Sequence, residues 1–196
     1  MSQENVEVVR GVRYRISLPN EKSAQRRTLD ERLFLRFPAA YRLLADRVLR
    51  LPQRSRLRRL LLTRIGRRAA AAANRRDFDV LLYGFDPAIE LELPESQVGG
   101  YLPPDLPGVH RGRDAYRHMW EGLIEAWPDL TLEPEELIDF GDRLLAAVQL
   151  RAHGRHSGIA LEQPIFQVFT LSRGLVVRQK DFPEREQALE AAGLSE

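Results

Sequence analysis

Apolar residues recur at helical spacing in the first half of the chain. One set follows intervals of three and four residues, and its members are Phe34, Phe37, Tyr41, Leu44, Val48 and Leu51. This spacing predicts one face of an amphipathic helix that Pro52 ends, whereas the polar residues 20–32 before it are expected to form a loop. A second helix is predicted from Ser55, its N-cap, to about Asn74, and a short third helix follows Asp77.

Strict alternation of apolar and polar residues begins in the middle of the chain. The segment AIELEL, residues 88–93, has period two and predicts a strand with one polar face. Residues 94–112 are rich in Pro and Gly and are expected to form a loop, and the apolar spacing over 114–127 predicts a strongly amphipathic helix.

The last third of the chain is dominated by strands. Four are predicted near 130–140, 143–153, 159–171 and 175–182, with short turns that make neighbours antiparallel hairpins, and a final helix follows over 185–192. Helices followed by a run of strands indicate an α+β fold.

Composition narrows the class of protein. The chain has 196 residues, enough for one domain with an appendage, and it contains no cysteine, which excludes disulfides, thiolate nucleophiles and cysteine-ligated zinc. No apolar run approaches the roughly 20 residues that span a bilayer. The first residues are acidic where a signal peptide would be basic and then apolar, so a cytoplasmic protein is expected.

Charge is segregated along the chain. Residues 10–76 contain 20 Lys and Arg against 4 Asp and Glu, whereas residues 77–196 contain 10 against 22. Nearly all the basic residues are arginines. A basic part and an acidic part predict mutual docking, contact with a polyanion through residues 11–76, or both.

An ordered set of segments resembles a known superfamily. The segments are NRRDFDVLL, FDPAIEL, RGRDAYRHMWEGLIEAWPDL, EELIDFGDRLLAAV and FTLSRGLVVRQKDFPEREQALEAAGL, together with the opening MSQENVEVVR. They resemble the nuclear transport factor 2-like superfamily in its SnoaL-like branch. The resemblance implies a cone-shaped α+β fold, in which a curved antiparallel sheet wraps around helices and leaves a deep cavity, commonly in a homodimer.

The resemblance also divides the chain. Residues 1–10 would begin the first helix of the cone, and residues 66–196 would form the SnoaL-like cone domain. Residues 11–65 stand where one short helix normally continues and form a basic, amphipathic helical insertion. Its arginines would either bind a nucleic acid or an anionic membrane, or pair with the acidic surface of the cone while its apolar faces pack against it.

Enzymes of the superfamily include ketosteroid isomerases, polyketide cyclases, scytalone dehydratases and limonene epoxide hydrolases. They share a dry pocket in which carboxylates or a His have shifted pKa values. The resemblance therefore implies a pocket for a small hydrophobic molecule, used either by a cofactor-free isomerase, cyclase or dehydratase, or by a non-catalytic ligand-binding or dimerisation module. No dinucleotide, phosphate-loop, nucleophile-elbow or zinc-protease motif is present, and no cofactor is expected.

Asp181 is the first candidate for a catalytic base. In LVVRQKDF, alternation places Leu175, Val177, Gln179 and Asp181 on one strand face. An Asp on an apolar face near a strand end is a candidate desolvated base, with Gln179 beside it in the pocket. The same Asp also suits a cap for the turn before Pro183.

Glu90 and Glu92 share the polar face of their strand. By the resemblance, Glu90 sits where many SnoaL-like sequences have a Glu, and Glu92 lies near the position of the ketosteroid isomerase base. Glu92 is therefore a second catalytic candidate and Glu90 a pocket residue, while a solvated outer face explains both equally well.

Several other polar or aromatic residues are candidates. His153 is a possible acid or base at the pocket mouth, although a solvated hairpin turn explains its His-x-x-His spacing to His156, and no metal site is expected. Gln149 and Gln167 stand in apolar strands, where a buried amide needs partners. Tyr116 and Trp120 lie on the helix that lines such cones and fit either the core or the pocket.

Overall fold

The computed structural model describes residues 7–10, 15–17, 26–94, 102–103, 105–155 and 157–193. Its elements in chain order are β1 (Glu7–Arg10), β2 (Ile16–Ser17), α1 (Leu29–Arg36), α2 (Pro38–Leu49), α3 (Arg56–Asn74), α4 (Phe78–Leu82), β3 (Phe85–Leu93), β4 (Gly108–Arg111), α5 (Arg113–Ala126), β5 (Thr131–Asp139), β6 (Arg143–His153), β7 (Ala160–Ser172), β8 (Leu175–Phe182) and α6 (Arg185–Ala192).

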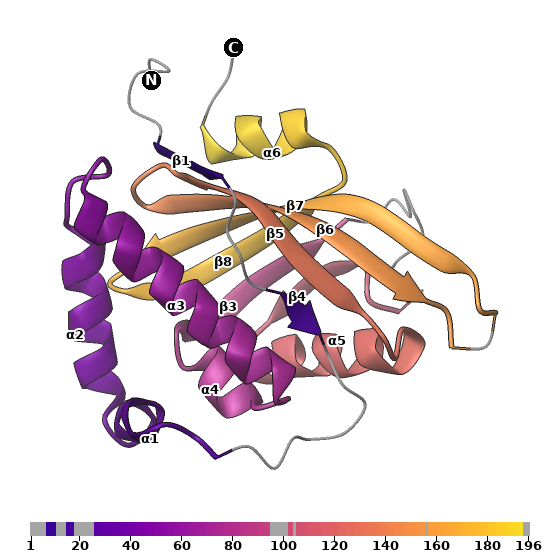
Figure 1. The fold of residues 1–196 in the computed structure, drawn as a ribbon, viewed down its shortest axis with the longest axis horizontal. Coiled ribbons are helices and arrows are strands. Elements are labelled where there is room, and N and C mark those ends of the chain that lie inside the picture. The colour runs from indigo at the N-terminus through magenta and orange to yellow at the C-terminus, as the bar shows by residue number, and fades with distance from the viewer. Residues whose placement is uncertain are drawn as a thin grey trace.

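One curved sheet of eight strands forms the body of the molecule (Figure 1). Its order is β1-β5-β6-β7-β8-β3-β4, and β2 also pairs with β5. β3 and β8 pair in parallel, and the other pairings of these strands are antiparallel. The sheet and its helices confirm the predicted α+β class and the cone shape.

Two β-bulges bend the long strands. Glu135 is the extra residue between the pairs Pro134–Val148 and Glu136–Ala147. Val177 is the extra residue in β8, between the pairs that join it to Thr170 and Leu171 of β7. A bulge increases the local twist of a strand, and these two help the sheet to curl.

The inner and outer faces of the sheet carry separate cores. The inner face packs against α4 and α5, where Phe78, Leu82, Tyr116 and Leu123 are buried. The outer face packs against α6, whose Ala188 meets a smaller cluster of strand residues. The helix α6 therefore lies on the opposite side of the sheet from α4 and α5 (Figure 1).

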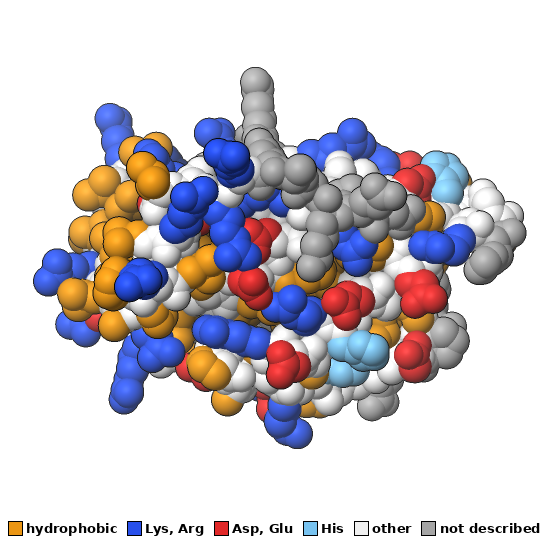
Figure 2. Space-filling model, turned by 90° about the horizontal axis from the view of Figure 1, so that it is seen from below, with side chains coloured by type: hydrophobic (Ala, Val, Ile, Leu, Met, Phe, Trp, Pro, Cys, Tyr) orange, Lys and Arg blue, Asp and Glu red, His pale blue; other side chains and the backbone are white. Residues whose placement is uncertain are grey.

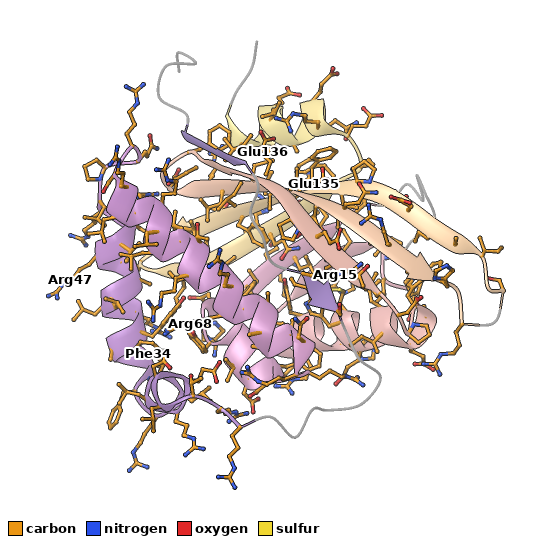
Figure 3. All side chains as sticks on the ribbon, viewed as in Figure 1. Arg15, Phe34, Arg47, Arg68, Glu135 and Glu136 are labelled. Carbon is orange, nitrogen blue, oxygen red and sulfur yellow. The ribbon has the colours of Figure 1, made fainter. Side chains whose placement is uncertain are left out.

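Residues 29–74 form the helices α1, α2 and α3, which lie at one side of the sheet (Figure 1). The apolar stripe predicted as one helix is divided at Phe37, because the residue before Pro38 is pushed out of helical geometry. α1 begins inside the predicted loop, where Thr28 and Glu31 form a capping box. Phe34 lies beside α2, with its ring 5.4 Å from that of Tyr41 (Figure 3). Two helices thus replace the single predicted one.

A buried ion pair attaches α3 to the sheet. Arg58 Nε donates to Asp139 Oδ2 at 2.6 Å, and Arg58 Nη2 donates to Asp139 Oδ1 at 2.8 Å. Arg58 also donates to the carbonyl oxygens of Leu49, Leu51 and Gly141. Its side chain is 1% exposed, so the guanidinium is fully enclosed.

The polar break between α3 and α4 ties these helices to distant segments. Asn74 Oδ1 accepts from the backbone N–H of Ser17 at 2.6 Å, and Asn74 Nδ2 donates to the Arg15 carbonyl at 3.0 Å. Asp77 caps α4, as predicted, and accepts two hydrogen bonds from Arg27. The break therefore holds β2 and the chain before α1 in place.

Other predicted elements agree with the structure except at the edges of the sheet. The helices α3, α4, α5 and α6 and the strands β3 and β5 to β8 are confirmed within a few residues. The prediction that residues 1–10 begin a helix is wrong for 7–10, which pair with β5 as β1, and residues 1–6 lie outside the described residues. β4 lies inside the predicted loop 94–112. The division into an insertion over 11–65 and a cone over 66–196 stays a prediction.

No helix in the described part of the chain is both long and apolar enough to cross a membrane.

Candidate functional site

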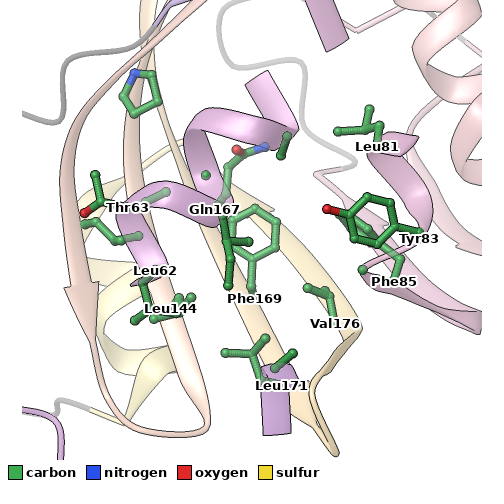
Figure 4. A pocket seen from close by; sticks show the side chains of 18 of the residues that line it. Leu62, Thr63, Leu81, Tyr83, Phe85, Leu144, Gln167, Phe169, Leu171 and Val176 are labelled. Carbon is green, nitrogen blue, oxygen red and sulfur yellow. The ribbon is translucent and has the colours of Figure 1, made fainter. Parts of the chain in front are cut away.

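A cavity of about 240 Å³ lies between the inner face of the sheet and the helices α2, α3 and α4. The sheet lines it with apolar side chains such as Ala146, Phe169 and Val176, as Figure 4 shows in part. α2 contributes Tyr41, Ala45 and Val48, and α3 contributes Leu62, Ile65 and Ala69. The helices of the predicted insertion therefore form one wall of the cavity.

A polar cluster stands at one side of this cavity. Gln167 and Tyr116 line it, and Asp181 and Gln179 lie behind them. Asp181 accepts from Gln167 Nε2 at 3.0 Å and from Gln179 Nε2 at 2.7 Å. Gln179 Oε1 in turn accepts from the Tyr116 hydroxyl at 2.6 Å. The four side chains form one connected network, and Figure 4 shows Gln167 among the apolar residues of the cavity.

The environment of Asp181 favours its neutral form. Burial raises the pKa of Asp181 to about 6, although the hydrogen bonds from Gln179 and Gln167 act in the opposite direction. Burial also raises the pKa of Tyr116, with a further contribution from the nearby Asp181 carboxylate. Asp181 is thus a carboxyl group that can take up or release a proton near neutral pH.

Trp120 adds a buried donor without a full hydrogen bond to the same side of the cavity. It lines the cavity and is 8% exposed. Its buried Nε1 makes no hydrogen bond of normal geometry within the described residues, and its weak interaction with the Tyr116 hydroxyl only slightly offsets the raised pKa of Tyr116. A buried donor without a partner is unfavourable by roughly 1–3 kcal/mol, so an acceptor placed there by a bound molecule would be stabilised.

The bulge at Val177 decides which residues of β8 face inward. Gln179 and Asp181 oppose the inward-facing Phe169 and Gln167, as alternation predicted. Beyond the bulge the alternation is reversed, so that Val176 lines the cavity. Leu175 packs instead against Tyr41 and Ala45 of α2. Of the four residues of β8 that were predicted to share one face, two, Gln179 and Asp181, lie on the inner face of the sheet.

Glu90 and Glu92 lie on the outer face of β3, away from the cavity. Arg178 Nη2 and Lys180 Nζ reach Glu92 at 2.7 and 2.5 Å, and Arg111 Nη2 reaches Glu90 at 3.1 Å. Burial opposes the charge on Glu92, but its hydrogen bonds with Lys180 and Arg178 outweigh it and lower the pKa. The geometry gives no support to a pocket role for these two carboxylates.

His153 and Gln149 also lie apart from the cavity. His153 ends β6 with a 63% exposed side chain, and its Nδ1 lies 2.7 Å from Asp129 Oδ2. Gln149 lies outside the cavity lining, and alternation along β6 places it on the face opposite Val148. His156 lies outside the described residues, among which no group of three or more potential metal ligands occurs.

The sequence did not reveal the role of α2 and α3 in the cavity. Tyr41 and Val48 belong to the predicted apolar stripe of the helix. Such a stripe predicts that its residues are buried, but it does not predict which element they pack against. The run of alanines from Ala69 to Ala73 predicted a helix but no contact with a cavity. Gln167 was the one polar residue of the cavity lining that was identified in an apolar strand.

Comparison with known proteins places the fold. The SnoaL-like domain model matches residues 67–179. No curated protein matches the chain. An NTF2-like protein of unknown function from Burkholderia pseudomallei is 19% identical, with a TM-score of 0.54 over 67% of this chain and 96% of that one. One from Burkholderia thailandensis is 22% identical, with a TM-score of 0.53 over 67% and 96%.

A third similar structure is that of TerC co-crystallised with polyporic acid. It is 21% identical and has a TM-score of 0.53 over 67% of this chain and 97% of that one.

Proposed function

The chain belongs to the SnoaL-like domain family, and we propose that it binds a small hydrophobic molecule that carries a hydrogen-bond acceptor such as a carbonyl group. The observation that carries this proposal is the apolar cavity with its polar cluster on one side. Binding sites of this kind are concave and mostly apolar, with a few polar groups that fix the orientation of the ligand. TerC, which shares the fold, was co-crystallised with a small molecule.

Trp120 defines the chemistry of the ligand. The apolar lining would hold the body of the molecule, and the buried Nε1 of Trp120, which has only a weak interaction with the Tyr116 hydroxyl, would donate to its acceptor. Gln167 is already oriented by its bond to Asp181, so the polar side of the cavity is fixed before a ligand enters. A preorganised site loses less conformational entropy on binding.

Two probes that differ only by a carbonyl test this proposal. Indanone and indane have the same apolar frame, and their affinities can be compared by the shift in melting temperature that each produces. Indanone is expected to bind more tightly to the wild type, and Trp120→Phe is expected to remove that preference while both probes still bind. Equal shifts from both probes in the wild type would refute the role of the acceptor, and no shift from either would refute the cavity proposal.

A second candidate function is proton abstraction beside the carbonyl of a bound ketone. It is favoured by one observation, the buried Asp181 with its raised pKa at the polar side of the cavity. The amide of Gln167 lies against the Asp181 carboxylate, so it must move aside for Asp181 to reach a substrate. Asp181 would then take the proton from the α-carbon while the carbonyl becomes an enolate; after the carboxyl proton exchanges with solvent, Asp181 would deliver a solvent-derived proton in the reverse step.

Deuterium exchange separates this candidate from simple binding. Indanone incubated in deuterated buffer exchanges its α-protons through the enolate, and proton NMR follows their loss. Catalysis predicts faster exchange with the wild type than with buffer, and background exchange with Asp181→Asn. If Asp181→Asn binds indanone normally and the wild type does not accelerate exchange, the protein is a binding module only.

A further inference from the structure

Large exposed apolar residues concentrate on the three N-terminal helices. Of nine in the described residues, seven lie between positions 29 and 60: Leu29, Leu33, Phe37, Leu43, Leu44, Leu57 and Leu60. The other two, Val109 and Ile159, stand alone elsewhere. Figure 2 shows hydrophobic side chains gathered at the end of the molecule where Figure 1 places α1 and α2, with Lys and Arg side chains around them. A patch of this kind marks an interaction site.

Exposed arginines surround these apolar residues. Eight of them form no ion pair with any described residue: Arg32, Arg36, Arg42, Arg47, Arg54, Arg56, Arg64 and Arg67. The nearby acids have other partners, since Asp30 pairs with Arg68, Glu31 with Arg75 and Asp46 with Arg50. Arg47 points away from the molecule on α2 (Figure 3). Ion pairs with the described residues therefore do not account for these arginines.

The two residue types share stripes on the helix surfaces. On α1, Leu29, Leu33 and Arg36 follow helical spacing. On α3, the same spacing joins Leu57 and Leu60 to Arg64 and Arg67. We call these exposed apolar residues and arginines of positions 29–67 the leucine–arginine face.

This face is distinct from the one that packs on the cone. Tyr41, Ala45 and Val48 of α2 are buried, whereas Leu43 and Leu44 on the same helix are each more than half exposed. Folding therefore uses one apolar side of α2 and leaves a second apolar side in solvent. An exposed apolar side of this kind indicates a surface that binds a partner.

We propose that the leucine–arginine face docks on an anionic membrane surface. Lipid headgroup phosphates accept hydrogen bonds from arginines, and the boundary with the acyl chains takes up leucine side chains, so a bilayer satisfies both residue types at once. A nucleic acid would use the arginines but leave the leucines in water. The inner sides of α2 and α3 line the cavity, so a docked protein would hold that cavity beside the bilayer.

Vesicle sedimentation tests the proposal. The full chain is mixed with vesicles of equal parts phosphatidylglycerol and phosphatidylcholine, or of phosphatidylcholine alone. We expect binding to the anionic vesicles only, weakened by salt. Arg47→Gln with Arg54→Gln is expected to weaken it about 30-fold, because each arginine near an anionic surface contributes about a factor of five. Leu43→Ser with Leu44→Ser is expected to weaken it by at least about 10-fold.

Matched variants elsewhere on the surface are the controls. Val109→Ser with Ile159→Ser removes the two large exposed apolar residues that the described part of the chain has outside the face, and Arg111→Gln with Arg155→Gln removes two other surface arginines. Both should bind vesicles like the wild type, and thermal melting should show that every variant is folded.

Three outcomes would overturn the proposal. The first is a folded wild type that does not bind anionic vesicles, or that binds no better than the variants of the face. The second is a shift of DNA or RNA mobility that the arginine variants abolish and the leucine variants leave intact, which would assign the face to a nucleic acid. The third is a dimer in the absence of lipid that Leu43→Ser with Leu44→Ser dissociates, which would assign the face to a second copy of the chain.

Discussion

Arg58 and Asp139 lie 81 residues apart in the sequence and form a two-point ion pair that joins α3 to the end of β5. Both side chains are nearly inaccessible to solvent, at 1% and 5% exposed. The pair lies at the contact between the N-terminal helices and the sheet, so it helps to position the wall that α2 and α3 add to the cavity.

Removing one partner of this pair should be costly. Arg58→Met leaves the Asp139 carboxylate buried without its cation, and unfolding in urea is expected to show a loss of about 3–5 kcal/mol. Arg64→Ala, an exposed position on the same helix, should change stability by less than about 0.5 kcal/mol. Because an apolar pair can replace a buried ion pair, Arg58→Met with Asp139→Leu should recover most of the loss. A single variant as stable as the wild type would show that the pair does not hold α3 in place.

Substitutions at two glycines with positive φ distinguish the cost of backbone strain from the cost of disturbing the packing of α2. At Gly174, φ is +79° and an added Cβ would lie 2.5 Å from the Arg42 carbonyl oxygen and 2.7 Å from the Asp46 nitrogen of α2. At Gly158, φ is +63° and nothing lies within 4 Å of such a Cβ. Gly158→Ala should lose about 1 kcal/mol through strain alone, and Gly174→Ala clearly more, because α2 must shift. Equal losses in thermal or urea unfolding would show that α2 does not pack closely on this turn.

The raised pKa of Asp181 predicts how stability depends on pH. The folded protein holds the Asp181 proton up to about pH 6, whereas the unfolded chain releases it near the ordinary value of 3.8. The stabilisation is therefore complete below about pH 4 and is lost as the pH rises through 6, a change of roughly 3 kcal/mol.

Asp181→Asn keeps this position neutral at every pH. Its stability relative to the wild type should therefore rise between pH 4 and pH 7, as measured by urea unfolding at each pH. Glu125→Gln, which removes an exposed carboxyl on α5, is the control for the loss of a surface charge. A flat difference for Asp181→Asn would mean that Asp181 is not buried as the structure shows.

The sequence predicted most helices and strands well because their apolar residues are bounded by clear turn and cap residues. The strands β5 to β8 are apolar segments separated by clear turn residues, and α5 carries a single apolar stripe that Pro128 ends. The edge strands were not predicted, because such a short strand is stabilised by the strand it pairs with and has no clear pattern of its own. β1, for example, has four residues and is held by β5. Where two local signals competed, as at Phe37 before Pro38, the proline rule prevailed over the apolar spacing.

The candidate site was predicted only in part, for a similar reason. Asp181, Gln179 and Gln167 were identified as polar residues on apolar strand faces, and the structure brings them together with Tyr116. The extra residue Val177 is not marked by any glycine or proline, so the reversal of faces that places Val176 in the cavity was not visible. The burial of Arg58 depends on Asp139, which no local pattern connects to it.

Filling the cavity should abolish binding without unfolding the protein. Ala146 faces the cavity from the middle of β6, and Ala146→Phe places a ring inside it. Since the ring occupies empty apolar space, stability should be kept or slightly raised. Ala71→Phe, which adds the same ring at an exposed position of α3, is the control.

The most direct test of the cavity proposal is a calorimetric titration of indanone into the wild type and Ala146→Phe. We expect saturable binding to the wild type, the same affinity for Ala71→Phe, and none for a folded Ala146→Phe. Binding that persists unchanged in Ala146→Phe would contradict it, because the ligand would then occupy some site other than this cavity.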